Sequence, residues 1–585
     1  ELEGLQALSD EDMVNVQRSN LLDAKSPNPS VETLLHAFLP HKFIDHTHSN
    51  AVLALTDQPD GEALAADLYG KRAALVPYVM PGFALAKKCS EVGKANPDVE
   101  GLILLKHGIF SMGATAEEAY VRMIDLVTMA EQRLAKATRK IFPGASLPAK
   151  TPDVAEVAPI LRGLLSIPAK VGGREAAQRF VFEFRSNPAI LAYVNGKEVA
   201  RYSQQGPVTP DHAIRTKGWP LIVPAPEAGK LDEFRKAAKE AADKFAAEYH
   251  GYFERNNAKQ VAKKKELDPI PRVVLVPGLG LFGIGNSSKD AKIAADLAET
   301  TVEVIADAER LGTYQCIPEP DIFDIEYWSL EQAKLSSAAE KPLARRVAVV
   351  TGGASGIGAA TAAALAREGA EVAILDRDVA KVKGFAIACD VTKPDEVRAA
   401  FDKVAATYGG VDIVVSNAGA AWQGKIGDVD DKTLRESFEL NFWAHQSVAQ
   451  NAVRIMRAQG LGGCLLFNAS KQAVNPGANF GPYGLPKAAT LFLSRQYALD
   501  HGADGIRSNA VNADRIRSKL LTDEMIAQRS KARGKTEAEY MSGNLLGLEV
   551  TADDVAQAFV ALAKATKTSS AVVTVDGGNI EAALR

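Results

Sequence analysis

Cysteine and long hydrophobic runs are both scarce in this sequence, and each shortage excludes a class of protein. Four of the 585 residues are cysteines: Cys89, Cys316, Cys389 and Cys464. No two of them are close enough in sequence for a metal knuckle or a redox pair, so we expect buried thiols in a cytoplasmic protein. No apolar run approaches the roughly 18–20 residues of a membrane helix, and the amino end lacks the pattern of a signal peptide.

An excess of one charge is also lacking. The sequence has 68 Lys+Arg and 72 Asp+Glu, which gives a formal net charge of -4. We therefore expect no domain basic enough to hold a nucleic acid, and neither a nucleic-acid nor a membrane partner. The residues that are present, 46% hydrophobic and 24% charged, are typical of globular proteins.

The pattern of apolar residues divides the chain into three blocks of α/β character. At roughly 100–200 residues per domain, the length supports several domains. The last block alternates β-branched runs with Ala-rich helical segments, which predicts a parallel sheet covered by helices on both faces. No internal repeat of fixed period is visible. The three blocks are residues 1–200, a middle α/β domain and linker at 201–340, and 341–585.

Local patterns in the first block predict strands and a helix. Residues 43–55 and 101–106 are strand-like, and residues 116–136 are helical. Thr115 and Glu118 have the spacing of a capping box, which marks the start of that helix.

A glycine-rich motif near residue 352 indicates a dinucleotide site. Thr351-Gly352-Gly353-Ala354-Ser355-Gly356-Ile357-Gly358 follows a predicted strand and opens a helix. Glycines let the backbone approach a pyrophosphate, and the helix N-terminus supplies free N–H groups to that anion. The next strand ends at Asp376, where an acid can bind ribose hydroxyls and repel a 2′-phosphate, so NAD is favoured over NADP.

The motifs that follow carry a family resemblance. Asn417-Ala418-Gly419, Asn441, Ser470 and Tyr483-Gly484-Leu485-Pro486-Lys487 occur in this order after the glycine loop. Residues 343–585 thereby resemble the short-chain dehydrogenase/reductase family, which implies a doubly wound Rossmann domain that uses NAD. The residues implied to bind the cofactor are Gly352, Ser355, Gly356, Ile357, Gly358, Asp376, Asp390, Val391, Asn417, Ala418, Gly419, Tyr483 and Lys487.

The same resemblance implies catalytic roles. Tyr483 would be the acid/base, Ser470 would orient the substrate oxygen, Lys487 would bind the nicotinamide ribose, and Asn441 would hold a water of the proton relay. The chemistry agrees, because a phenol titrates near ~10 and needs a nearby cation to act near neutrality. Lys487 lies one helical turn after Tyr483.

Three positions depart from the family pattern. Ala513-Asp514 replaces the Pro-Gly that follows the sixth strand, which changes the expected substrate lid. Pro486 lies inside the Tyr-to-Lys turn, where it removes one N–H from a helix start. The stretch from Asp376 to Asp390 is short for a helix plus a strand, so either the crossover is trimmed or residues are absent from the sequence.

A second motif, rich in histidine, lies near the amino end. His46 and His48 are two residues apart on a strand-like stretch, so both imidazoles share one face. His107 follows another apolar strand. Three imidazoles with an open fourth position suit a catalytic Zn²⁺ better than a closed structural site.

The residues around these histidines resemble the class II aldolase family, which also contains sugar-phosphate epimerases and the metal-free adducin head. The resemblance implies Zn²⁺ on His46, His48 and His107, with Glu32 as acid/base. A divalent metal can stabilise the enediolate left by carbon–carbon cleavage, and a carboxylate can deprotonate the hydroxyl that becomes the aldehyde. The family's Gly-rich phosphate loop is not visible in the 31 residues before Glu32, so we expect a truncated start.

The two parts together resemble the bifunctional rhamnulose-1-phosphate aldolase/alcohol dehydrogenase family. This implies cleavage of L-rhamnulose 1-phosphate to dihydroxyacetone phosphate and L-lactaldehyde, with NAD-dependent oxidation or reduction of the lactaldehyde. The substrates would be a sugar phosphate and a short hydroxyaldehyde, and both resemblances imply a homo-oligomer. Three alternatives stay open: an epimerase first domain, an adducin-like binding scaffold, and a sugar-alcohol dehydrogenase with a vestigial aldolase domain.

Two further segments have a structural and a functional interpretation. Gly278-Leu279-Gly280-Leu281-Phe282-Gly283 matches a dinucleotide motif, but no acid-ended strand follows it. We expect a strand-to-helix turn in a domain that binds no nucleotide. The tract from Thr209 to Lys217 clusters cations and His212; it could reach the aldolase pocket, but a solvated surface loop is favoured.

Overall fold

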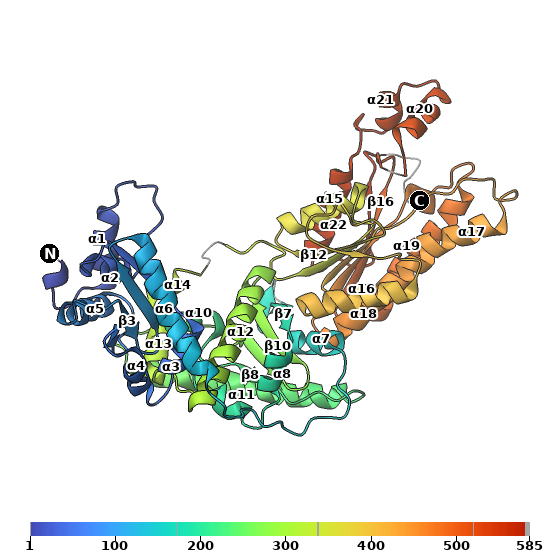
Figure 1. The fold of residues 1–585 in the computed structure, drawn as a ribbon. Helices are drawn as coiled ribbons and strands as arrows, with labels where there is room; N and C mark the ends of the chain where they lie inside the picture. Colours follow the sequence, from blue (N-terminus) through green and yellow to red (C-terminus); the bar gives the residue numbers. More distant parts are fainter. Residues whose placement is uncertain (1, 172–173, 336–338, 519, 579–585) are drawn as a thin grey trace.

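The computed structural model describes residues 2–171, 174–335, 339–518 and 520–578. Three main sheets form successive lobes along the chain, and the dehydrogenase-like lobe lies at the opposite end from the N-terminus (Figure 1). Among these residues, no helix combines the length and the apolar character needed to cross a membrane.

The first lobe is built on a four-stranded mixed sheet in the order β1-β4-β3-β2. β1 and β3 each pair antiparallel with β4, and β2 pairs parallel with β3. Helix α6 begins after Thr115, whose side chain accepts from the Glu118 N–H, as the capping spacing predicts. The strands are β1 (Phe43–Thr47), β2 (Ala73–Val76), β3 (Gly101–Leu104) and β4 (Gly108–Gly113), and the helices include α2 (Thr33–Phe38), α3 (Asn50–Thr56), α4 (Gly61–Tyr69), α5 (Phe83–Ala95) and α6 (Ala116–Ala135).

The prediction of a strand over residues 43–55 is wrong in its second half. β1 ends at Thr47 and helix α3 begins at Asn50. Every residue of α3 after Asn50 is buried, because the helix packs between α6 and the long helix α12 (Ser288–Leu311) of the next lobe. An apolar run buried on all sides has no clear periodicity, and pattern alone does not separate strand from helix there.

The second lobe repeats the topology of the first. Its sheet has the order β7-β10-β9-β8, with the same antiparallel and parallel pairings. The hexapeptides on the two central strands also match: Gly-Ile-Phe-Ser-Met-Gly in β4 and Gly-Leu-Phe-Gly-Ile-Gly in β10. The expectation that no internal repeat exists is therefore wrong at the level of the fold. The strands are β7 (Val181–Arg185), β8 (Leu221–Ile222), β9 (Val273–Val276) and β10 (Gly280–Gly285).

The Gly278–Gly283 segment is a hairpin rather than a strand-to-helix turn. It joins β9 to β10, which pair antiparallel. Gly278 and Gly280 have φ values of +86° and +146°, which L side chains rarely adopt. A Cβ on Gly283 would lie 2.3 Å from the Ala291 carbonyl oxygen of α12. Helix–sheet packing thus accounts for the glycines of this motif.

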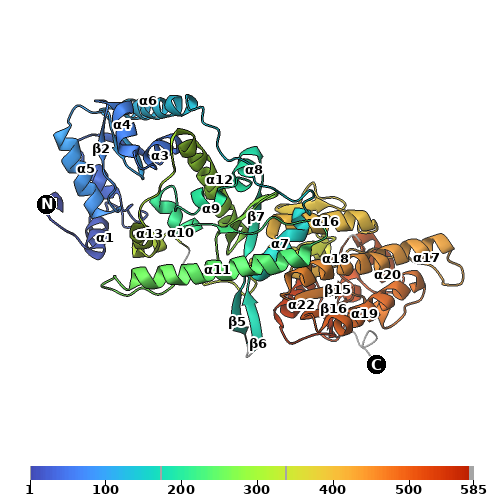
Figure 2. The same ribbon diagram turned by 90° about the horizontal axis from the view of Figure 1, so that it is seen from below.

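The second lobe also contains a long helix and a small hairpin, and it begins earlier in the chain than the sequence predicts. The long helix α11 (Leu231–Asn257) runs along the lobe, and the small hairpin of β5 (Ile167–Val171) and β6 (Arg174–Gln178) projects from it (Figure 2). β7 and helix α7 (Val154–Leu164) precede the boundary that we predicted at residue 200, yet β7 belongs to the second sheet. We therefore propose a boundary between α6 and α7.

The third lobe has the doubly wound α/β fold that the sequence predicts. Seven parallel strands follow the order β13-β12-β11-β14-β15-β16-β17. Helices α15 and α22 cover one face, and α16, α18 and α19 cover the other. The strands are β11 (Val347–Thr351), β12 (Glu371–Asp376), β13 (Phe385–Ala388), β14 (Ile413–Ser416), β15 (Gly463–Asn468), β16 (Ile506–Ala513) and β17 (Val572–Val575); the helices are α15 (Gly356–Arg367), α16 (Pro394–Tyr408), α18 (Ala444–Gln459), α19 (Gly481–His501) and α22 (Ala552–Lys564).

The short stretch after Asp376 is a trimmed crossover. β12 pairs parallel with β13, and residues 377–384 between them form turns without a helix. The edge strand β13 is therefore only partly covered: all four of its residues are half-buried or exposed.

A buried ionic network joins the second and third lobes. The Arg162 guanidinium of α7 donates to both carboxylate oxygens of Asp412, at 3.0 and 2.7 Å, and Arg179 also donates to Asp412. The side chains of Arg162 and Asp412 are 0% and 1% exposed. Burial alone would raise the pKa of Asp412, but the two guanidinium groups lower it far below its usual range. This carboxylate is thus held as an anion at the junction.

Candidate active sites

The predicted metal residues come together at the edge of the first sheet. His46 is on β1, His48 follows that strand, and His107 lies in the tight turn between β3 and β4. Glu32 is the N-cap residue of α2. Gly108 permits this approach, because a Cβ there would lie 2.6 Å from the Thr47 carbonyl oxygen and 2.9 Å from the His48 ring.

The geometry of this cluster fits a zinc ion. One donor atom from each of Glu32, His46, His48 and His107 lies within 4.8 Å of the others. His46 Nε2 is 3.1 Å from His48 Nε2 and 3.3 Å from Glu32 Oε1, and His107 Nε2 is 3.6 Å from Glu32 Oε1. Tetrahedral zinc with ligands at roughly 2.0–2.1 Å places its donors about 3.3 Å apart.

Hydrogen bonding also orients His46 for a metal. Its Nδ1 is 3.0 Å from the Ile109 carbonyl oxygen, which can only accept, so Nδ1 carries the proton and Nε2 keeps its lone pair. Metal-binding histidines are commonly oriented in this way. Burial, together with the neighbouring His107 and His46, lowers the pKa of His48 to about 3, so that ring is neutral near pH 7.

Glu32 is half-buried beside two of these rings. Burial alone would raise the pKa of its carboxyl, but His107 and His46 outweigh burial and lower the pKa well below its usual range. The cluster therefore contains one carboxylate and three imidazoles.

The second lobe completes the wall of this site, contrary to the expectation of a solvated loop. Thr209, His212 and Lys217 are buried, and Asp211 Oδ2 lies 3.7 Å from His48 Nδ1. Asp211 also pairs with Lys334 Nζ at 3.4 Å. The composition of this loop is visible in the sequence, but its contact with His48 has no sequence signal, because that contact depends on how the two lobes dock.

In the described part of the second lobe, residues other than histidine occupy the positions of His46, His48 and His107. Across the first sheet His46 pairs with Phe110, and across the second sheet Phe184 pairs with Phe282, the same residue of the matching hexapeptide. By this register, Ser186 takes the place of His48. Leu279 precedes Gly280 as His107 precedes Gly108. The second lobe is thus a copy of the first without the imidazoles.

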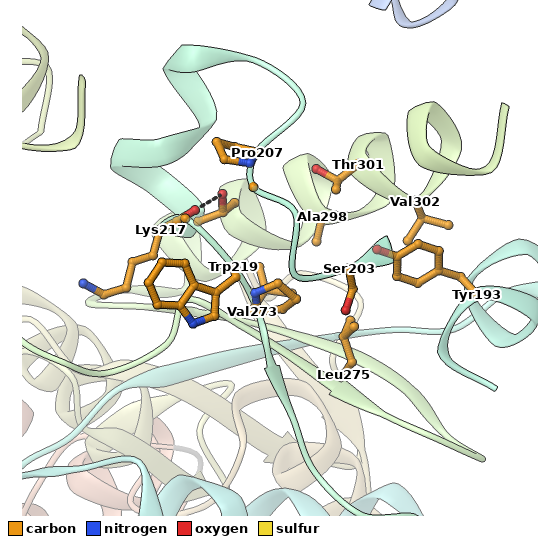
Figure 3. Close-up of a pocket in the computed structure, with 14 residues that line it drawn as sticks. Tyr193, Ser203, Pro207, Lys217, Trp219, Val273, Leu275, Ala298, Thr301 and Val302 are labelled. Carbon is orange, nitrogen blue, oxygen red and sulfur yellow. Dashed lines mark hydrogen bonds between the residues drawn. The ribbon is translucent and has the colours of Figure 1, made fainter. Parts of the chain in front are cut away.

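A small cavity inside the second lobe is lined mainly by apolar groups, among them Val273, Leu275 and Val302 (Figure 3). Its volume is about 40 Å³, far below the roughly 300–1,000 Å³ of ligand pockets. The Lys217 side chain leads away from this cavity (Figure 3), and its Nζ lies 3.7 Å from the Tyr249 ring centre and 3.6 Å from Glu326 Oε1. Lys217 therefore belongs to a buried packing network.

The predicted nucleotide residues of the third lobe line a cavity of about 730 Å³, which is large enough for a dinucleotide. Gly352 and Gly356 have φ values of +62° and +55°, and Asp376 Oδ2 accepts from the Ala354 N–H at 3.0 Å. Gly358 lies below the loop, where a Cβ would be 2.1 Å from the Gly352 carbonyl oxygen. The predicted residues that line the cavity are Gly352, Ser355, Gly356, Ile357, Asp376, Asp390, Val391, Asn417, Ala418 and Gly419.

Ser470 and Tyr483 line an adjoining cavity of about 580 Å³. The Ser470 side chain is close enough to the Tyr483 hydroxyl to lower its pKa. Lys487 is on the same helix as Tyr483, its Nζ lies 6.0 Å from the Tyr483 ring centre, and it donates to the Asn468 carbonyl at 2.8 Å. These three side chains can bind a substrate oxygen and move its proton.

Asn441 is fully buried within the π-helical turn Glu439–Trp443. Its Nδ2 donates to the Ala420 carbonyl at 2.8 Å, and its own carbonyl accepts from Thr490 Oγ1 at 2.6 Å. A Cβ on Gly419 would lie 2.9 Å from Asn441 Oδ1 and 3.4 Å from Lys487 Nζ, so glycine is needed there. Asn441 thus braces the loop between the nucleotide cavity and Lys487.

Burial shifts the pKa values of Tyr483 and Lys487 in opposite directions. It raises the pKa of Tyr483, against a lowering hydrogen bond from Ser470, and the charge of Asp514 raises it further. Burial lowers the pKa of Lys487 to about 8. Both shifts favour neutral groups, as expected for a site removed from water.

The fold and the two sites define the class of protein: aldolase-type domains followed by a dehydrogenase domain. Family models agree over most of the chain. "Class II Aldolase and Adducin N-terminal domain" matches residues 4–134, "Aldolase class II, second domain" matches 152–335, and "Enoyl-(Acyl carrier protein) reductase" matches 352–579.

One relative is similar along nearly the whole chain. It is the "Uncharacterized oxidoreductase YuxG" of Bacillus subtilis (strain 168), with 33% identity over 602 residues, 98% of this chain and 86% of that protein. The chain therefore belongs to the same family as this oxidoreductase, in which class II aldolase domains are fused to a dehydrogenase domain of the short-chain type.

Shorter stretches resemble single-domain enzymes. The "(-)-isopiperitenol/(-)-carveol dehydrogenase, mitochondrial" of Mentha piperita is 34% identical over 260 residues, 41% of this chain and 96% of that protein. The crystal structure of a short-chain type dehydrogenase/reductase from Mycobacterium marinum is 29% identical, with a TM-score of 0.37, and the match covers 40% of this chain and 95% of that one.

Proposed function

We propose that this protein is a bifunctional enzyme of rhamnose catabolism. Its first domain cleaves L-rhamnulose 1-phosphate to dihydroxyacetone phosphate and L-lactaldehyde, and its third domain oxidises or reduces lactaldehyde with NAD. The observation that carries the proposal is the gathering of one carboxylate and three imidazoles within 4.8 Å, in a chain that also holds a Ser–Tyr pair beside a nucleotide-sized cavity.

In the aldolase half, His46, His48 and His107 would hold the metal, which we propose is Zn²⁺. When bound, the ion would stabilise, as a Lewis acid, the negative charge that develops on the substrate oxygens. Glu32 is the carboxylate of the cluster, so we assign to its Oε1 the proton of the hydroxyl that becomes the aldehyde. Asp211 contacts Nδ1 of His48, the ring atom away from the cluster, and orients that imidazole.

In the dehydrogenase half, NAD would occupy the cavity lined by the glycine loop and Asp376 and would supply the hydride acceptor or donor. A carboxylate in place of a cation at residue 376 favours NAD over NADP. Ser470 Oγ orients the substrate oxygen and Tyr483 Oη exchanges its proton. Lys487 Nζ stabilises the phenolate and reaches the nicotinamide ribose. Asn441 keeps the neighbouring loop in place for the proton relay.

We further propose a cytoplasmic homo-oligomer. Four free cysteines, all buried, fit a reducing compartment. Large apolar side chains are exposed on the third lobe: Trp443, which ends the π-helical turn before α18, is 53% exposed, and Phe492 and Leu499 of α19 are 66% and 78% exposed. A second copy of the chain is the partner that would cover this surface.

The test is a single incubation of the zinc-loaded protein with L-rhamnulose 1-phosphate and NAD⁺. We expect dihydroxyacetone phosphate and NADH to form together. Recovery of an epimerised sugar phosphate, without a three-carbon product, would instead establish the epimerase alternative.

A further inference from the structure

The cavity beside Ser470 and Tyr483 carries a strong positive charge. Its wall is formed by the segment after β15, the loop after β16 and helix α20 (Asp523–Lys531). Helices α20 and α21 (Glu537–Met541) project beyond the sheet at this end (Figure 1). Among the residues that the structure describes, the lining contains four cations but a single carboxylate, Asp514; the cations are Lys471, Arg515, Arg529 and Arg533.

Asp514 offsets only part of this charge. Its Oδ2 lies 3.1 Å from Lys471 Nζ and 3.5 Å from Arg515 Nε. Arg529 and Arg533 instead lie over aromatic rings, at 5.4 Å from the Phe480 centre and 5.3 Å from the Tyr540 centre. Within the part of the chain that the structure describes, no ion pair links either arginine to a carboxylate.

These cations face the substrate rather than the nucleotide. The nucleotide cavity adjoins this one and shares Ile357, Asn468, Ser518 and Leu520 with it. None of the four cations lines the nucleotide cavity. The pyrophosphate therefore does not account for them, whereas a substrate held at Ser470 and Tyr483 would lie among them.

We infer that the dehydrogenase takes an anionic substrate, a hydroxy or oxo compound that carries a phosphate or a carboxylate. Arginine is suited to both groups, because its planar guanidinium donates two parallel hydrogen bonds to them. A short neutral aldehyde would leave this charge unused. The inference therefore adds anionic compounds, the phosphorylated sugar among them, to the lactaldehyde of the proposed function.

The redox step balances with the groups present and NAD. In the oxidative direction, the carbinol carbon transfers a hydride to NAD⁺ and its hydroxyl gives a proton to the Tyr483 phenolate, so a ketone and NADH form. In retro-aldol cleavage, one of the two carbons of the bond that breaks must be bonded directly to a carbonyl carbon. If the proposed aldolase function holds, oxidation of an anionic polyol would therefore supply a ketone for the first domain.

Anion binding to the NAD⁺-loaded full chain tests this inference. The chain carries His48→Ala, so that the aldolase site does not contribute a metal-bound anion. Isothermal titration with inorganic phosphate, and separately with acetate, distinguishes the two anionic groups. We expect at least one of them to bind, and Arg529→Ala/Arg533→Ala to weaken that binding at least about tenfold, since hydrogen bonds to charged groups contribute roughly 1.5–3 kcal/mol.

Two variants serve as controls. Arg517→Ala removes a cation that pairs with Glu549 and Asp523 and does not line the cavity, so it should leave anion binding unchanged. Arg529→Lys/Arg533→Lys keeps the charge and should retain most of the binding. NAD⁺ affinity should be equal in all of them.

Failure of this inference is distinguishable from failure of the proposed function. Absence of anion binding in the parent chain, or equal affinity in the double alanine variant, would overturn the inference. If the wild-type protein does not cleave rhamnulose 1-phosphate, but the anion still binds at the dehydrogenase, the proposed function is refuted and this inference stands.

Discussion

The first and second lobes share one topology and differ in the side chains that it presents. Both have the strand order and pairings of the same four-stranded sheet, and both place a hexapeptide of matching pattern on the central strand. His46, His48 and His107 in the first lobe correspond to Phe184, Ser186 and Leu279 in the second. The candidate metal site therefore depends on the side chains at these three positions and not on the scaffold alone.

The second lobe nevertheless contributes to the candidate metal site of the first lobe. Its loop brings Asp211 to 3.7 Å from His48, and Lys106 Nζ of the first lobe donates to the Gln315 carbonyl of the second. The second lobe, which has other residues at the three imidazole positions, thus serves as a wall and a connector. Its other face docks on the dehydrogenase through Arg162 and Asp412.

The largest expected effect is on aldol cleavage, and it distinguishes the first lobe from the second. His48→Ala should lower cleavage of rhamnulose 1-phosphate more than about 10³-fold, because it removes a metal ligand. Ser186→Ala, at the equivalent position of the copy, should leave cleavage unchanged. Coupled assays of dihydroxyacetone phosphate measure both, and NAD-linked turnover of added lactaldehyde should persist in each variant.

A second substitution separates the aldolase half from the dehydrogenase half. Tyr483→Phe removes the proton-exchanging hydroxyl and should lower NADH formation by about 10³-fold or more, within the range of general acid–base catalysis combined with lost substrate binding. Cleavage should be unaffected. Tyr497→Phe, on the same helix but hydrogen-bonded to Gln446, is the matched control, and a comparable loss there would contradict the assignment.

The next largest effect is on stability, at the junction between the second lobe and the dehydrogenase lobe. Asp412→Asn leaves two buried guanidinium groups without their anion and should lower the free energy of unfolding by about 3–5 kcal/mol. Urea denaturation measures this. Asp431→Asn, at a surface pair where the Asp431 side chain is 91% exposed, should not move the midpoint; equal effects of the two substitutions would show that burial is not the cause.

The smallest effect concerns pH. Burial lowers the pKa of Lys487 to about 8 in the folded chain, against ~10.4 when unfolded. Between these values the unfolded state binds more protons, so stability should rise with pH from about 8 to 10, by up to about 3 kcal/mol. Lys487→Met should abolish this rise, whereas Lys432→Met, at a side chain that is 84% exposed, should retain it. Urea unfolding of the NAD-free chain at the two pH values measures the difference.

The sequence predicted much of the fold and of both sites, for physical reasons. Period-two spacing placed His46 and His48 on one face, and the glycine loop required the strand–turn–helix unit that β11 and α15 form. The failures involve docking and burial. The apolar pattern predicts a strand over residues 50–55, where the structure has α3, because a helix buried on all sides shows no clear periodicity. Composition favours a solvated loop for Thr209–Lys217, because the contact of Asp211 with His48 crosses between lobes and has no local signal.

The sequence also does not predict the cations that line the cavity beside Ser470 and Tyr483. Arg529 and Arg533 lie far in sequence from Ser470 and Tyr483, and only the fold of α20 over the sheet edge brings them together. The sequence hints at it only through Ala513-Asp514 in place of the family's Pro-Gly, since this replacement puts a charge where the pattern has none.

Metal stoichiometry after loading with Zn²⁺ and removal of excess ion most directly tests the claim that one lobe of the pair binds metal and its copy does not. The result we expect is one zinc per chain in the wild type and in Ser186→Ala, none in His48→Ala, and equal NAD⁺ affinity in all three. Two ions per chain, or one ion that persists in His48→Ala, would contradict it.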